Sequence, residues 1–249
     1  EGRPERRRRT PHLSARPPVF MQRTPGKLFA LCLAAIALIG PFCVHLFLPV
    51  LPVVKQAMQL SDTVAQATFS VALLGMAIST LFYGSAADRY GRRPVLIAGL
   101  SLFLLGSALS AIAPSPALLI AGRFVQALGA GCGATLVRAI ARDAYGPEQL
   151  VKAIAYLTMF YTLGPMISPI AGGLLVDHFG WRAAFAFSLF GGAVLLLGAV
   201  TQLYETKPPG EEKDRPSVLA GYRDLDRKST RLNSSYIPFS YAVFCLKKK

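Results

Sequence analysis

The sequence predicts an all-α membrane protein with six transmembrane helices, on three observations. Hydrophobic residues make up 53% of the 249-residue chain, whereas charged residues make up only 16%. The apolar residues gather in blocks close to the length of about 20 residues that crosses the hydrocarbon core of a bilayer as a helix. Short turns rich in charge or proline separate these blocks, and such turns belong in water. We expect the spans at approximately 28–51, 63–83, 95–113, 117–140, 153–176 and 182–203.

The first expected span, 28–51, differs from a secretory signal peptide. Its apolar stretch is longer than the apolar region of such a peptide, and no small-residue cleavage pattern follows it. We therefore expect it to remain in the protein as a membrane helix.

A charged turn, Gly84 to Pro94, connects the second and third expected spans. Gly84 and Gly91 would permit a tight reversal of the chain. Asp88 can accept hydrogen bonds from the amides that begin the next helix, or pair with an arginine. The turn also contains Arg89, Arg92 and Arg93. Since four ionic side chains do not belong in hydrocarbon, the two spans form a hairpin whose turn lies in water.

The fourth expected span contains an arginine at membrane depth, Arg123. A charge there is costly unless it faces a partner or a water-filled cavity. Gln126 follows three residues later and lies on the same helix face, which indicates a polar stripe. Alternatively, Arg123 extends its side chain to the membrane interface, because it lies only about two turns from Pro116.

The fifth expected span contains several helix-disturbing residues. The fifth combines Gly164, Pro165, Pro169, Gly172 and Gly173, so we expect a bent and closely packed helix. After the sixth span, the composition changes to a solvated linker.

Lysine and arginine in the short loops predict the orientation of the chain. They precede the first span and fill the loops between spans two and three and between spans four and five. The positive-inside rule therefore places these loops and both chain termini in the cytoplasm.

Three stretches resemble motifs of the major facilitator superfamily. The Gly84–Pro94 turn is similar to the loop motif between that family's second and third helices, which implies that it latches two transporter halves on the cytoplasmic side and helps gate alternating access. The stretch around Arg123 resembles the fourth-helix motif, which implies a part in proton coupling. The stretch 163–173 resembles the fifth-helix motif of drug/proton antiporters, which implies control of leak and direction. The resemblance covers about residues 28–206.

Three further stretches resemble the Bcr/CflA drug-resistance subfamily: 48–52, 137–145 and 180–185. This resemblance implies that Asp143 pairs with the region of Arg92 and Arg93. The chain departs from the subfamily at His45, where an aspartate is usual. A histidine also exchanges protons, but protonation creates a cation instead of removing an anion. We expect His45 to line the transport cavity, either coupling protons or as a neutral side chain hydrogen-bonded within the bundle.

The function implied is that of a proton-coupled multidrug or small-molecule efflux transporter of the bacterial inner membrane. The substrate would be small and amphipathic and would bind near the midplane, where two six-helix bundles face each other. No cofactor is expected, since the proton gradient supplies the energy. The chain contains one such bundle, so we expect the N-terminal half of a transporter whose partner is a missing second half. Alternatively, it is a six-helix half-transporter that pairs with a second copy.

Two other classes of function are considered. A membrane-embedded enzyme would need a nucleophile, a metal set or paired acids at membrane depth, and the expected spans contain none, so we expect no enzyme. A membrane-anchored interaction protein would use the basic run Arg6 to Arg9 to bind anionic lipid or nucleic acid. We expect contact with the lipid bilayer and no nucleic-acid partner.

The net charge of +14 lies mostly at the two ends of the chain. Residues 1–20 hold six arginines and two glutamates before the first methionine, Met21, and we expect a basic disordered extension or a non-native leader. We expect the six-helix bundle within 21–204 and the start of a cytoplasmic linker within 205–225. Residues 226–249 resemble translated sequencing-adapter sequence, so we expect a non-native tail there.

Overall fold

The described part of the protein is built from helices. The computed structural model describes residues 26–206, with the side chains of residues 147 and 148 excepted. Six stretches there are long and apolar enough to cross a membrane, which confirms the predicted fold class. The helices are α1 (Lys27–Ala37), α2 (Ile39–His45), α3 (Val50–Ala57), α4 (Asp62–Tyr90), α5 (Arg92–Ala111), α6 (Pro116–Ala144), α7 (Pro147–Phe179) and α8 (Trp181–Gln202). The predicted boundaries at 1–20, 205–225 and 226–249 lie wholly or mostly outside the described residues.

The first membrane-crossing stretch is interrupted, whereas a single span over 28–51 was predicted. Helix α1 ends at Ala37 and α2 ends at His45. Each of these ends lies four residues before a proline, Pro41 and Pro49 respectively. Because a proline has no amide hydrogen and its ring crowds the carbonyl four residues earlier, the regular helix stops at those carbonyls. The crossing stretch is therefore Lys27–His45, and α3 is a separate short helix.

The predicted turn 84–94 is wrong in its extent, because helix occupies nearly all of it. Helix α4 continues to Tyr90 and α5 begins at Arg92, so the reversal takes place at Gly91 alone. Gly91 has φ +102°, a conformation that favours glycine. Hydropathy marks the part of a helix inside the membrane, but the polar residues that follow can continue the same helix into water.

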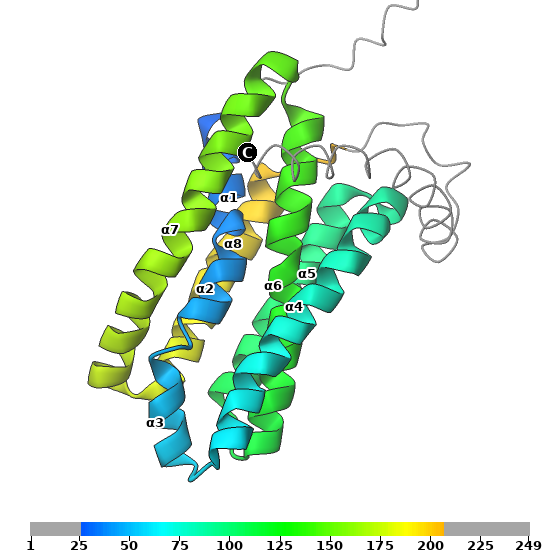
Figure 1. Ribbon diagram of the computed structural model, residues 1–249. Helices are drawn as coiled ribbons and strands as arrows, with labels where there is room; N and C mark the ends of the chain where they lie inside the picture. The colour runs from blue at the N-terminus through cyan, green and yellow to red at the C-terminus, as the bar shows by residue number, and fades with distance from the viewer. Residues whose placement is uncertain (1–25, 207–249) are drawn as a thin grey trace, which may run out of the picture.

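Helices α5 and α6 pack with their backbones in contact. A Cβ atom added at Gly106 would lie 2.1 Å from the amide nitrogen of Gln126, and one added at Gly129 would lie 2.2 Å from that of Phe103. Figure 1 shows α4 beside this pair, with α7 across the bundle and α1, α2 and α8 between them. Close approach of small residues stabilises membrane helices through van der Waals contact, so this glycine seam joins α5 and α6 tightly.

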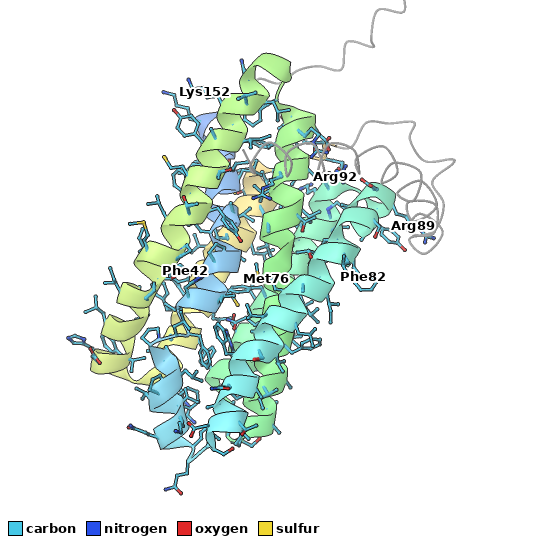
Figure 2. The ribbon with its side chains drawn as sticks, in the orientation of Figure 1. Phe42, Met76, Phe82, Arg89, Arg92 and Lys152 are labelled. Carbon is cyan, nitrogen blue, oxygen red and sulfur yellow. The ribbon has the colours of Figure 1, made fainter. Side chains whose placement is uncertain are left out.

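The interior of the bundle consists of two apolar clusters. One includes Leu33, Leu96 and Leu136, and the other includes Val50, Leu119 and Phe185. We call the end of the bundle that carries Lys27, the Gly91 turn and the α6–α7 turn the basic end. Figure 2 shows Arg92 and Lys152 at this end.

Candidate functional site

An ion network joins three helices at the basic end. Arg92, the first residue of α5, lies with Nη1 2.7 Å from Oδ1 of Asp88 in the last turn of α4. Its Nε donates to Oδ2 of Asp143, near the end of α6, at 3.1 Å. The Arg92 side chain is only 17% exposed, and reduced solvent contact strengthens such ionic interactions. Arg92 thus links α4, α5 and α6, and the pairing expected of Asp143 is present.

The start of α5 is capped from a distant part of the chain. Gly91 provides no capping side chain. Instead, the carboxylate of Glu205, just after α8, accepts hydrogen bonds from the amides of Arg92 at 2.9 Å and Arg93 at 3.1 Å. Arg93 in turn donates from Nη2 to the carbonyl of Val200 in α8 at 2.7 Å. A carboxylate at a helix N-terminus is favourable because it accepts from free amides and opposes the helix dipole.

Sequence reasoning missed Glu205. Of the two alternatives expected for Asp88, the structure shows the pairing with an arginine, Arg92. Two features of the sequence could have indicated a distant cap. No Ser, Thr, Asp or Asn comes directly before α5 to cap it, and an acidic residue follows the last span. Gly84 was also misjudged, since it lies within α4 and an added Cβ would meet nothing within 4 Å. Arg89 is exposed and lies over the ring of Tyr90, 5.3 Å from its centroid.

Arg123 lies inside the bundle between the two apolar clusters. Its side chain is buried, with the residue only 1% exposed, so it does not extend to the interface. Its Nη1 donates to Oε1 of Gln126 at 2.7 Å and to the carbonyl of Cys43 at 3.2 Å. The guanidinium lies 4.3 Å from the ring centroid of Phe47. Gln126 donates onward to Ser107 of α5 at 2.9 Å, so a polar chain runs from the first span to α5.

The described groups that contact the Arg123 guanidinium are all neutral. Within the described residues, no carboxylate lies close enough to form an ion pair with it. Its Nε and Nη2 have no hydrogen-bond partner there. A cavity of about 10 Å³ lies beside the guanidinium, lined in part by Phe185 and Ser188. This is close to the smallest volume that holds one water molecule, about 10–15 Å³.

His45 is half-buried and does not belong to this polar chain. Its Nδ1 lies 2.8 Å from the carbonyl oxygen of Pro41 in the preceding turn. Arg123 instead contacts Cys43 of α2 and Phe47 between α2 and α3. The hydrogen bond fits the expectation of a histidine bonded within the bundle, and a role in coupling stays a prediction.

Helix α7 remains continuous through Pro165 and Pro169. Two of its three glycines allow close approach to α2 and to the residue after it: an added Cβ at Gly164 would lie 2.7 Å from Pro41, and one at Gly172 would lie 2.4 Å from the carbonyl oxygen of Leu46. At Gly173 it would meet nothing within 4 Å. The close packing expected of this stretch thus applies to Gly164 and Gly172 only.

The comparisons with known proteins identify the family. A family model described as Major Facilitator Superfamily matches residues 30–246. The chain belongs to the major facilitator superfamily. Six apolar spans in a member of this superfamily also make it a multi-pass membrane protein.

Among curated proteins, one similar sequence is the "Multidrug resistance protein MdtL" of Escherichia coli O81 (strain ED1a). It is 36% identical over 181 residues, which is 72% of this chain and 46% of the relative. The chain therefore spans about half the length of the curated relatives it matches.

Two solved transporter structures share the fold. The human organic anion transporter MFSD10 (TETRAN) matches with a TM-score of 0.60 at 23% identity, over 77% of this chain and 50% of that one. The xylose transporter XylE from E. coli, in a partially occluded inward open conformation, matches with a TM-score of 0.63 at 17% identity. The match covers 72% of this chain and 48% of that one. At these identities, the likeness concerns the fold alone.

Proposed function

We propose that this chain is the N-terminal half of a proton-coupled efflux transporter for small amphipathic molecules, of the Bcr/CflA type. The observation that carries the proposal is the 36% identity to a multidrug resistance protein over 181 residues. It is reinforced by the ion network of Arg92, which joins three helices at one end of the bundle. A transporter also agrees with the expectation that the chain is not an enzyme.

The proposal assigns gating to the ion network. Asp88, Arg92 and Asp143 hold α4, α5 and α6 together at the basic end, and Glu205 ties the chain after α8 to the same point. Breaking these contacts would free the end of α4 and the chain after α8 to move relative to α5 and α6, which the close contacts at Gly106 and Gly129 keep together. A set of ionic contacts at one end of a bundle is therefore suited to an opening that alternates with closure, the kind of motion by which paired bundles transport.

The proposed location is the bacterial inner membrane, with both termini in the cytoplasm. The residues at the basic end include Lys27, Arg89, Arg92, Arg142 and Lys152. At the opposite end, acidic residues balance the basic ones, and Lys55 pairs with Asp62. This asymmetry supports a cytoplasmic basic end under the positive-inside rule.

Proton coupling is assigned to the Arg123 chain together with His45. A buried arginine balanced only by neutral groups is sensitive to any change of charge nearby. If His45 titrates during transport, His45→Ala alters how efflux varies between about pH 6 and pH 8, where an ordinary histidine changes charge. An unchanged pH profile in this variant would remove His45 from the coupling mechanism.

The decisive experiment is a chimera in which residues 26–206 of this chain replace the matching half of MdtL. Both proteins are expressed in cells deleted for their efflux pumps, and export of a fluorescent cationic dye is followed with and without a protonophore. We expect the chimera to export the dye, and the protonophore to abolish export. Asp143→Asn in the chimera should reduce export, whereas Arg182→Gln, at the opposite end, should not.

A chimera that reaches the membrane in normal amounts yet exports no dye, while MdtL does, would contradict the proposal. Export by the 249-residue chain alone would instead favour a half-transporter that pairs with a second copy. If deleting residues 1–20 abolishes a binding activity, and neither the chimera nor the 249-residue chain transports, the chain is a membrane-anchored interaction protein.

A further inference from the structure

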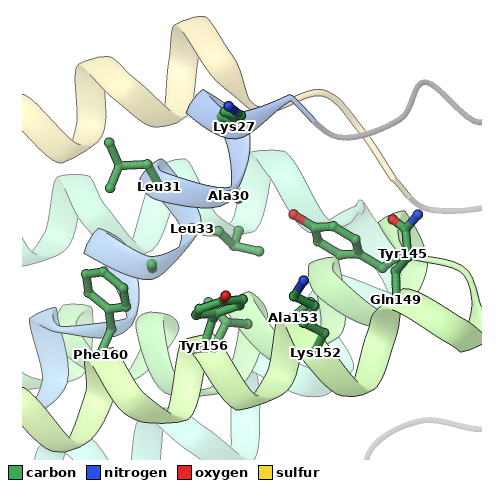
Figure 3. A pocket seen from close by; sticks show the side chains of 12 residues that line it. Lys27, Ala30, Leu31, Leu33, Tyr145, Gln149, Lys152, Ala153, Tyr156 and Phe160 are labelled. Carbon is green, nitrogen blue, oxygen red and sulfur yellow. The ribbon is translucent and has the colours of Figure 1, made fainter.

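A pocket lies between α1 and α7 at the basic end and opens to the surface. Its volume is about 540 Å³, within the range of about 300–1,000 Å³ that is usual for sites of small molecules. Figure 3 shows side chains of the two helices facing each other across it. Leu31, Tyr156 and Phe160 give this α1–α7 pocket an apolar and aromatic lining. The pocket is therefore suited to a small molecule with an apolar body.

The charged side chains of the α1–α7 pocket are cationic. Lys27 begins the first membrane-crossing stretch, and Lys152 lies in the first turn of the fifth, which starts at Gln149. Both lysines line the pocket and are exposed. Among the described residues of the lining, none is acidic. An opening lined by one sign of charge raises the local concentration of ions of the opposite sign, so this pocket favours anions.

A third cation, Arg138, lies on α6. It is the only exposed residue of this helix between Gly122 and Ala141. Its guanidinium lies 5.9 Å from the ring centroid of Tyr161 in α7. Tyr161 directly follows Phe160, which lines the pocket. The exposed guanidinium therefore lies between α6 and α7, at the level along α7 where the pocket ends.

The contact with Tyr161 directs the Arg138 side chain toward the membrane centre. Arg138 lies about 9 Å along the helix axis from Ala144, the end of α6, and Tyr161 lies about 18 Å from Gln149, the start of the fifth membrane-crossing stretch. Because both of these ends lie at the basic end, the tyrosine is attached deeper than the arginine. Arg138 therefore does not extend to the membrane surface, and an exposed charge at this depth faces a water-filled space.

No described carboxylate forms an ion pair with Arg138. The acidic residues whose side chains the structure describes lie in the first or last turn of a helix or just beyond its end: Asp62, Asp88, Asp143, Asp177 and Glu205. At membrane depth, the described side chains thus include the cations Arg123 and Arg138 but no anion. A substrate that passes this surface meets positive charge that a negative group of its own can balance.

We propose that the α1–α7 pocket and Arg138 select anionic substrates, namely small organic anions with an aromatic or apolar body. Lys27 and Lys152 attract the anion at the basic end, and Tyr156 and Phe160 contact its apolar body. Deeper in the bundle, Arg138 pairs with the negative group, for which a planar guanidinium is well suited because it can donate two parallel hydrogen bonds to a carboxylate. This inference rests on the transport function proposed above and names the substrate class of the same path.

Two dyes with the same xanthene ring system but opposite charge test this preference: fluorescein, an anion at neutral pH, and tetramethylrhodamine methyl ester, a cation. Their binding to the purified 249-residue chain is measured by fluorescence anisotropy. We expect Arg138→Gln to weaken fluorescein binding about tenfold and Lys152→Gln to weaken it about threefold, and neither to weaken binding of the cationic dye. Arg138→Lys should retain most of the binding because it keeps the charge. Arg182→Gln is the matched control, since it removes an arginine that also lies over a ring, that of Trp181, at the opposite end.

Unchanged fluorescein binding in Arg138→Gln, or an equal loss for both dyes, would overturn the proposal. A measurement on the wild-type chain needs no substitution: added salt should weaken the binding of fluorescein, because it screens the attraction to the cations, and fluorescein binding that does not respond to salt would contradict the assignment.

The chimera with the second half of MdtL separates this inference from the transport function. In the chimera, Arg138→Gln should reduce export of fluorescein relative to export of the cationic dye. An equal reduction for both dyes would give Arg138 a general role in transport and overturn its role in selecting charge. If the chimera exports neither dye, the transport function fails, whereas the anisotropy measurements on the chain still decide whether the pocket prefers anions.

Discussion

Removal of the Glu205 carboxylate should loosen the start of α5. In Glu205→Ala, the amides of Arg92 and Arg93 lose the acceptors that lie 2.9 Å and 3.1 Å away. Loss of a helix-capping acceptor costs about 1 kcal/mol, and loss of a negative charge beside a helix N-terminus costs about 0.3–1 kcal/mol more. Because Glu205 is exposed, we take the sum as about 1–2 kcal/mol, which corresponds to roughly 5–30-fold more frequent local opening.

Hydrogen–deuterium exchange of the purified chain measures this opening directly. The peptide that contains Arg92 and Arg93 should exchange faster in Glu205→Ala by that factor, because exchange follows local opening. Glu205→Gln keeps one acceptor oxygen but loses the charge, so its effect should be smaller. Asp62→Ala provides the matched control, since it removes an acid from the first turn of α4 at the opposite end.

Unchanged exchange at the start of α5 in Glu205→Ala would contradict the capping role of Glu205. So would an equal acceleration there in Asp62→Ala, because the effect would then reflect general destabilisation. A faster exchange in Glu205→Ala that spreads over all of α5 would mean that the carboxylate supports the whole helix and not its first turn.

Three further predictions concern the glycine packing, the contact of Phe47 with Arg123 and the ion network, and the first has a control variant. Gly106→Ala should destabilise the chain by about 1–3 kcal/mol in thermal unfolding, because the added Cβ would overlap the backbone of α6. Gly191→Ala, where nothing lies within 4 Å of the added Cβ, should be neutral or stabilise by about 0.5–1 kcal/mol; equal effects of the two would contradict the glycine seam. Phe47→Leu should cost about 1–2 kcal/mol through loss of the cation–π contact with Arg123, and no change in the unfolding temperature would show that this contact contributes little. Asp143→Asn should lower stability by about 1 kcal/mol at low salt and by less at high salt, since screening already weakens the ion pair; a salt-independent effect would indicate a packing role instead.

The sequence alone was sufficient to predict that six spans exist, because the hydropathy and length of a stretch indicate directly whether it can cross a membrane. The break in the first span also had a readable cause in Pro41 and Pro49, but apolar composition continues through both breaks and conceals it. The second span was expected to end at residue 83, whereas α4 continues to Tyr90, because hydropathy decreases before the helix ends.

The partners of the functional side chains were harder to predict, because they lie far away in the chain. Arg123 contacts Cys43, which is 80 positions away, and Glu205 reaches Arg92 across 113 positions. Hydropathy indicates that a buried charge needs a partner but does not specify which residue provides it. Such pairings depend on how the helices pack. The packing at the glycine seam depends on the shapes of two helix surfaces together, which the pattern of residues within one helix does not reveal.

The glycine seam also has a mechanical consequence. Since the backbones of α5 and α6 touch at Gly106 and Gly129, neither helix can slide or turn against the other without steric overlap. The two helices therefore act as one stiff lever, with Arg92 and Asp143 at its tip. Since Gln126 and Arg123 belong to α6, a displacement of that tip would also move these two side chains in the middle of the membrane.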